Sequence, residues 1–151
     1  MKNRIKLRRN GRGQSTVEFA YLCLFVFFPL LFGVINFAIV IYTYSEVSYA
    51  ANAAARWASV HGSTYACSTC TPTGPATSSD INNFVQGAAA WANSSPTVTS
   101  TWTASGCQGG ITNCPGSTVQ VQVQYNYQLF VPGFKSVTLP LAATTQMVIS
   151  Q

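Results

Sequence analysis

Four of the five cysteines form the most chemically capable set of residues in this chain. They lie as a close pair, Cys67 and Cys70, and as a wider pair, Cys107 and Cys114. Four thiolates can hold a zinc ion, and four cysteines can also form two disulfides, in any of three pairings. A thioredoxin-like redox site is not expected, because no βαβ pattern surrounds the close pair. The fifth cysteine, Cys23, lies in an apolar stretch, where we interpret it as a small apolar residue.

The sequence contains few side chains that could carry out acid–base catalysis. Beyond position 44 the carboxylates, cations and histidine are Glu46, Arg56, His61, Asp80 and Lys135. This set offers no paired acids, no second histidine and no acidic cluster for a metal. The sequence also lacks a G-x-S-x-G motif and a phosphate-binding loop with its lysine. We therefore expect a protein that is not an enzyme, with no catalytic residues, no metal and no cofactor.

Glu18 is the one carboxylate with an unusual setting. It directly precedes 24 uncharged residues, Phe19 to Tyr42, in which Asn36 is the strongly polar side chain. A carboxylate at the edge of such a stretch costs free energy in a membrane, less near the interface than the roughly 3 kcal/mol at the bilayer centre. A charge in this position is a functional candidate, although a place in the headgroup layer would also explain it.

The apolar stretch is long enough to cross a membrane as a helix. A helix of this length covers about 36 Å, against a hydrocarbon core of roughly 30 Å, and bulky apolar side chains surround its axis. We predict a transmembrane helix over residues 14–44, with Tyr42 and Tyr44 at the interface. Pro29 should loosen this helix locally, and Asn36 should hydrogen-bond either to a neighbouring helix or to its own backbone. A buried core helix and a secretory signal peptide are the alternatives, but their apolar segments are normally shorter.

Charge is concentrated before the apolar stretch. The chain carries +5 overall, yet from residue 14 onward two cations face three acids, which sums to −1. Six of the eight basic residues precede that point, and these are Lys2, Arg4, Lys6, Arg8, Arg9 and Arg12. The asymmetry predicts a cytoplasmic N-terminus and an exported C-terminal domain. Because membrane topology already explains the basic residues, we do not expect the protein to bind nucleic acid. Export to an oxidising compartment favours disulfides over zinc at the four paired cysteines.

The junction between the basic tip and the apolar stretch resembles the processing site of TadE/TadF-like proteins. It reads Gly11-Arg12-Gly13-Gln14-Ser15-Thr16-Val17-Glu18-Phe19. The resemblance implies that residues 1–13 are a leader peptide and that a prepilin peptidase cuts between Gly13 and Gln14. It further implies that Glu18 is the glutamate at the fifth mature position, followed by the aromatic Phe19. Glu18 would then pair with the new α-amine, and the family pattern favours the amine of a neighbouring subunit.

The resemblance continues into an Ala-rich segment, Ala50 to Ala58, that contains Arg56. It implies a minor pilin or pseudopilin of a tight-adherence (Flp, type IVb) pilus, anchored in the bacterial inner membrane or incorporated in an extracellular pilus. Its implied partners are the prepilin peptidase, other pilin and minor pilin subunits, the Tad inner-membrane assembly platform and the lipid bilayer. An uncleaved bitopic protein whose exported domain binds a partner is the main alternative, and a secreted binding module is another.

The remainder, residues 45–151, predicts a small exported α+β domain. Apolar residues recur every three or four positions over 45–61, which extends the first helix into a pilin-like spine. After a loop over 62–79, a second helix is predicted over 80–93, with Ser79 as its cap. Residues 97–150 then alternate with period two, most regularly near Val121, and predict about three antiparallel strands. Pro140 places its strand at a sheet edge.

Overall fold

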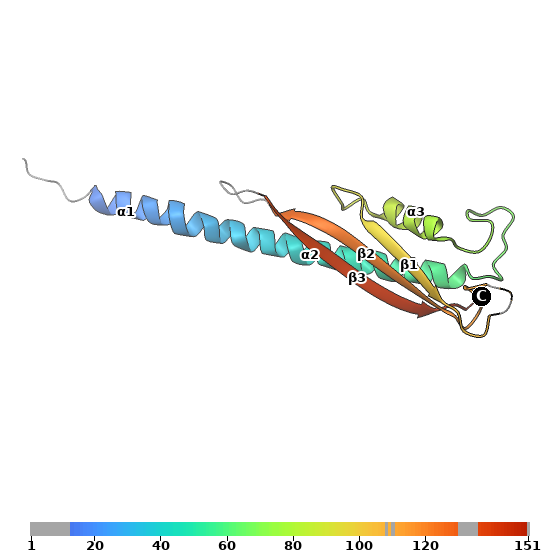
Figure 1. Ribbon diagram of the computed structural model, residues 1–151. Coiled ribbons are helices and arrows are strands. Elements are labelled where there is room, and N and C mark those ends of the chain that lie inside the picture. Colours follow the sequence, from blue (N-terminus) through green and yellow to red (C-terminus); the bar gives the residue numbers. More distant parts are fainter. Residues whose placement is uncertain (1–12, 108, 110, 130–135, 151) are drawn as a thin grey trace, which may run out of the picture. The chain divides into compact units, whose positions relative to one another are not determined.

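The computed structural model describes residues 13–107, 109, 111–129 and 136–150, and of Gln14 only the backbone. The predictions for the leader before Gly13 and for Lys135 lie outside these residues. The chain divides into two units, Met1–Ala38 and Ile39–Gln151. The described elements are α1 (Gln14–Leu22), the π-helical turn η1 (Cys23–Phe27), α2 (Phe28–Val60), α3 (Ser78–Ala88), β1 (Thr97–Thr103), β2 (Thr118–Leu129) and β3 (Val137–Val148) (Figure 1). The long N-terminal helix, the second helix and the three strands confirm the predicted α+β class.

The helix of the first unit is apolar and exposed over most of its surface. Phe19 exposes 68% of its surface and Phe37 exposes 67%. By length and composition, the helical segment Ser15–Val60 could cross a membrane. Apolar surface of this extent is characteristic of a helix in lipid, so the structure fits a protein that crosses a membrane once, while the bounds 14–44 stay a prediction.

This helix changes its hydrogen-bond pattern just before Pro29. At the end of η1, the Phe28 N–H donates to the Cys23 carbonyl, five residues back. Proline has no N–H with which to continue the α-helical ladder, and π-helical turns of this kind are inserted within α-helices. The wider turn is therefore the local loosening expected at Pro29. Farther along, Asn36 Nδ2 donates to the Phe32 carbonyl at 2.8 Å, which is the own-backbone bond that the sequence left open.

In the second unit, the buried face of α2 is built largely from alanines. These small side chains share one core with apolar residues of β2 and α3, because a helix with short side chains can lie close to its neighbours. Val121 and Ile81 are fully buried in this core. The main α2 and β2 members are Val47, Ala50, Ala51, Ala54, Ala55, Ala58, Val119, Val121 and Val123.

The sheet is antiparallel with the strand order β1-β2-β3. In the register, Val123 of β2 lies opposite Val98 of β1 and Ala143 of β3. Alternate residues of β2 are buried and exposed, so its valines face the helices while its glutamines face solvent. Pro140 lies in the edge strand β3, opposite Asn126, where a missing N–H does not interrupt the ladder between strands.

Helix α3 begins and ends earlier than the sequence predicted. Its cap is Thr77, not Ser79: the Thr77 side chain accepts from the Asp80 N–H, and Asp80 accepts from the Thr77 N–H. This reciprocal pair is a capping box, which satisfies two backbone donors at once. The helix stops at Ala88 instead of continuing to residue 93, because the chain turns after Ala89 and Trp91 packs edge-on against Tyr125.

Candidate processing and assembly segment

The predicted cleavage junction lies where α1 begins. Gly13 is the N-cap, and Gln14 is the first helical residue. Gly13 has φ −84° and ψ −20°, which any residue can adopt. A Cβ added to Gly13 would meet no atom within 4 Å among the described residues. Neither the backbone conformation nor the packing described at this position therefore requires glycine.

Glu18 lies on α1, four residues after Gln14, so the two positions occupy the same side of the helix. Its side chain is exposed, as are those of Val17 and Phe19, which expose 55% and 68% of their surfaces. The carboxylate therefore lies among exposed apolar side chains that can contact lipid or another apolar helix. It belongs to the first unit, whereas all four paired cysteines belong to the second.

The Ala-rich part of the segment has a different role from the apolar part. Ala50, Ala51 and Ala54 lie in the core of the second unit, while Arg56 points to solvent. The segment thus combines an exposed apolar helix with a helical face that packs against the sheet. The sequence places both on one helix, and the structure shows which residues face the sheet.

The four outer cysteines form two local disulfides. Cys67 is bonded to Cys70 and Cys107 to Cys114, with Cα–Cα distances of 5.4 and 5.7 Å. Of the three possible pairings, the structure therefore has the one between sequence neighbours. Cys23 is a free thiol. No group of three or more histidine, cysteine, aspartate or glutamate side chains in the described part of the chain could hold a metal ion.

Ser117 supports the second disulfide, and sequence reasoning missed it. Its side chain is fully buried, with Oγ at 3.0 Å from the Cys107 sulfur and 3.1 Å from the Cys114 sulfur. The same oxygen accepts the Ser105 N–H at 3.1 Å. A disulfide sulfur has no hydrogen to give, so the hydroxyl is the donor toward it. A serine beside a Gly-rich loop gives no sequence signal for such a role.

Two further titratable groups, His61 and Asp80, serve local structure. His61 Nδ1 lies 2.7 Å from the Trp57 carbonyl, four residues back, and can donate a hydrogen bond to it. The Thr77 hydroxyl and N–H hydrogen-bond Asp80 and hold the pKa of its carboxyl below its ordinary value of 3.8. Among the residues that the structure describes, neither group faces a second acid or base in the arrangement that general acid–base catalysis uses.

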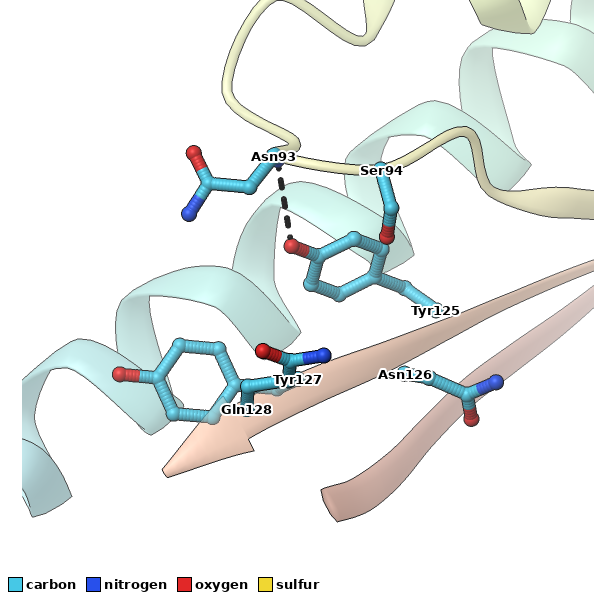
Figure 2. Close-up of a pocket in the computed structure, with 6 residues that line it drawn as sticks. All are labelled: Asn93, Ser94, Tyr125, Asn126, Tyr127 and Gln128. Carbon is cyan, nitrogen blue, oxygen red and sulfur yellow. Dashed lines mark hydrogen bonds between the residues drawn. The ribbon is translucent and has the colours of Figure 1, made fainter. Parts of the chain in front are cut away.

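A small pocket of about 130 Å³ lies beside the end of β2, and Figure 2 shows it. The Asn93 N–H donates to the Tyr125 hydroxyl at 3.2 Å, as the dashed line in Figure 2 marks. The residues that line the pocket are Asn93, Ser94, Tyr125, Asn126, Tyr127 and Gln128. This lining contains no carboxylate, no histidine and no cation. The pocket therefore lacks the groups that proton transfer needs.

Comparison with known proteins returns one finding. Residues 13–56 match a family model described as TadE-like protein. No curated protein and no solved structure matches the chain. The matched residues begin at the glycine before α1 and end at the arginine in the Ala-rich face of α2.

Proposed function

Residues 13–56 are a TadE-like segment, and from this premise we propose that the chain is a minor pilin-like subunit of a tight-adherence pilus. In this proposal a prepilin peptidase removes the leader, and the mature subunit takes part in pilus assembly and adhesion. The observation that carries the proposal is the coincidence of the family match with the exposed apolar helix over the same residues. A TadE-like segment supports association with a Tad pilus; the subunit role is our inference.

Cleavage between Gly13 and Gln14 is the first part of the proposal. The described backbone and packing at Gly13 do not require glycine. Recognition of this residue by a peptidase would explain why a glycine is present. The junction also lies at the first residue of α1, which is where the apolar helix of the proposed mature chain begins. Both observations support a processing site at this position.

Assembly through Glu18 is the second part. Cleavage would create a cation at the α-amine of Gln14, and the carboxylate of Glu18 is its natural counter-charge. Opposite charges attract far more strongly in a low-dielectric apolar setting than in water. We propose that Glu18 pairs with the α-amine of a neighbouring subunit, which would set the register between adjacent apolar helices.

Topology and activity complete the proposal. We propose that the N-terminus is cytoplasmic, which the basic residues before the span support, so that the sheet, α3 and both disulfides would be exported. Disulfides form and persist in such an oxidising compartment. We propose that the exported domain acts by binding and packing and is not an enzyme; its histidine, His61, contacts a backbone carbonyl and Asp80 belongs to a helix cap.

Terminal mass spectrometry of the membrane-extracted protein tests the proposal most directly. Cells with an active prepilin peptidase should yield a chain that starts at Gln14, and cells without the peptidase should yield one that starts at Met1. A Gly13→Leu variant should keep Met1 in both, because the peptidase reads this position. An intact Met1 terminus in peptidase-positive cells would favour the uncleaved bitopic protein. A start near Ala54, after the small residues Ala51-Asn52-Ala53 that resemble a signal-peptidase site, would favour a secreted module.

A further inference from the structure

A second pocket, of about 180 Å³, lies within the second unit between α2, α3 and the loop that joins them. It differs from the pocket near β2 in combining two aromatic rings with a carboxylate, an amide and a hydroxyl. The residues that line it are Trp57, Thr71, Pro72, Asp80, Asn83 and Phe84. The proposed pilus role makes no use of this combination.

The polar groups come mainly from one side of α3. Asp80, Asn83 and Phe84 have the spacing i, i+3 and i+4, which brings their side chains to the same helix face. The hydrogen bonds of the Asp80 carboxylate to Thr77 both go to Oδ2, so Oδ1 accepts none from the described residues. The Asn83 side chain is exposed and makes no hydrogen bond within the described chain. The pocket therefore offers an acceptor and an amide that are not already engaged.

The apolar wall is a stack of aromatic rings that stays partly exposed. Trp57 stacks on Phe84 with ring centroids 5.4 Å apart and on His61 with centroids 4.2 Å apart. The Tyr65 ring lies 4.3 Å from that of His61, tilted by 55°. Of these four rings, Trp57 and Phe84 line the pocket, and His61 and Tyr65 lie behind them. Rings held in this way lose little conformational entropy when a ligand packs against them. They suit a ligand that has apolar C–H groups on one face and hydroxyls around its edge.

The loop wall is fixed by the first disulfide. The Cys67–Cys70 bond closes a tight loop directly before Thr71, and the Cys67 N–H donates to the Thr73 carbonyl at 3.1 Å. The Ala76 N–H donates to the His61 carbonyl at 2.8 Å, which ties the loop back to the end of α2. The disulfide thus holds the hydroxyl-bearing wall in place before any ligand arrives, and such preorganisation favours binding.

We propose that this pocket binds a single neutral sugar ring. Its volume of about 180 Å³ lies below the roughly 300 Å³ at which pockets for drug-sized ligands begin, so the site has room for one small ring and not for an oligosaccharide. The sugar's hydroxyls would bond to Asp80, Asn83 and Thr71, while its C–H face would pack on the aromatic wall. The lining holds one ionised acid and no cation, so acidic sugars and phosphates are disfavoured. This inference does not depend on the pilus role.

The experiment uses the full chain in an amine-oxide detergent, which carries no sugar headgroup. Saturation-transfer NMR against neutral methyl glycosides should detect binding of at least one, and titration should give its affinity. Asn83→Ala should weaken that affinity about tenfold, the loss expected for one or two hydrogen bonds. Asn82→Ala, the same change one residue earlier and outside the pocket lining, should leave the affinity unchanged.

Three results would overturn the sugar pocket. One is the absence of binding by any neutral glycoside to the folded wild-type chain. Another is an equal effect of Asn83→Ala and Asn82→Ala. The third is displacement of the glycoside by choline but no weakening in Asn83→Ala, which would point to a cation held by the rings. The double variant Cys67→Ser, Cys70→Ser should bind more weakly with the circular dichroism of the fold preserved; unchanged binding would contradict the role given to the disulfide.

Discussion

At the scale of single residues, the informative positions are those where a side chain is polar and its surroundings are not. Glu18 on the exposed apolar helix and Ser117 in the buried end of the sheet are two such cases. The first was visible in the sequence, because a charge beside 24 uncharged residues is conspicuous. The second was hidden, since a serine becomes important only when folding brings a disulfide to it. Each yields a substitution whose effect depends on one atom.

For Glu18, we expect Glu18→Gln to keep membrane insertion and cleavage while losing co-assembly with other pilin subunits. The amide keeps the shape but not the charge, and an unpaired α-amine in an apolar setting is strongly unfavourable. Co-purification of partner subunits should fall about tenfold or more. Glu46→Gln, on the same helix but beyond the apolar stretch, is the matched control and should assemble normally. Wild-type assembly by Glu18→Gln would refute charge pairing.

For Ser117, we expect Ser117→Ala to lower the free energy of unfolding by about 1 kcal/mol, because it removes the hydroxyl that accepts the Ser105 N–H and contacts the disulfide. Ser100 provides the comparison, since its buried Oγ has no hydrogen-bond partner among the described residues. Ser100→Ala should therefore be neutral or slightly stabilising. Thermal unfolding of the oxidised protein measures both. Equal losses in the two variants would show that Ser117 matters only for packing.

At the scale of elements, the ends of helices depend on the cap as much as on the apolar stripe. The sequence Thr77-Ser78-Ser79-Asp80 offers three hydroxyls, and the one that caps α3 is the one with an acid three residues later. The stripe also suggested a longer helix, yet the packing of Trp91 on Tyr125 requires the chain to leave the helix first. Tertiary contacts of this kind are absent from local periodicity.

The cap makes a prediction about pH. The folded state lowers the pKa of Asp80 below 3.8, so its ionised form stabilises the fold above the unfolded pKa, and this contribution is lost as pH falls through the lower folded pKa. The stability difference between wild type and Asp80→Asn should thus shrink as pH decreases from about 6 to about 3. A stability difference between wild type and Asp80→Asn that does not change with pH would exclude this linkage.

The cap also predicts the effect of two substitutions. Thr77→Ala should lower the free energy of unfolding by about 1 kcal/mol, and Ser79→Ala should lower it much less.

At the scale of the whole molecule, a few strong patterns predicted most of the architecture. The uncharged stretch predicted the exposed helix, and the Val–Gln alternation around Val121 predicted the central strand and its buried face. The pairing of the cysteines could not be predicted, because sequence spacing allows three arrangements. The two pockets were also beyond reach, since each joins residues that are distant along the chain. The cleavage site and the role of Glu18 stay predictions.

The two-unit organisation predicts a pattern of thiol reactivity in intact cells. If the second unit is exported, Cys67, Cys70, Cys107 and Cys114 should react with a membrane-impermeant maleimide only after treatment with a reductant. The Cys23→Ser variant removes the free thiol of the apolar helix and makes the readout specific. Labelling without reductant, or one equivalent of zinc in the purified protein, would contradict the disulfides. Labelling that requires permeabilised cells would contradict the orientation.

The hydrogen bonds of residues 149 and 150 have a consequence for the timing of folding. The Ile149 N–H donates to the Ser117 carbonyl, and the Ser150 N–H donates to the Ser59 carbonyl at the end of α2. Ile149 is also almost fully buried in the core. A ribosome makes these residues after every other described element, so the core lacks Ile149 and both of these hydrogen bonds until they emerge. A nascent chain stalled before β3 would therefore have an incomplete core and should be more open to proteolysis than the finished chain.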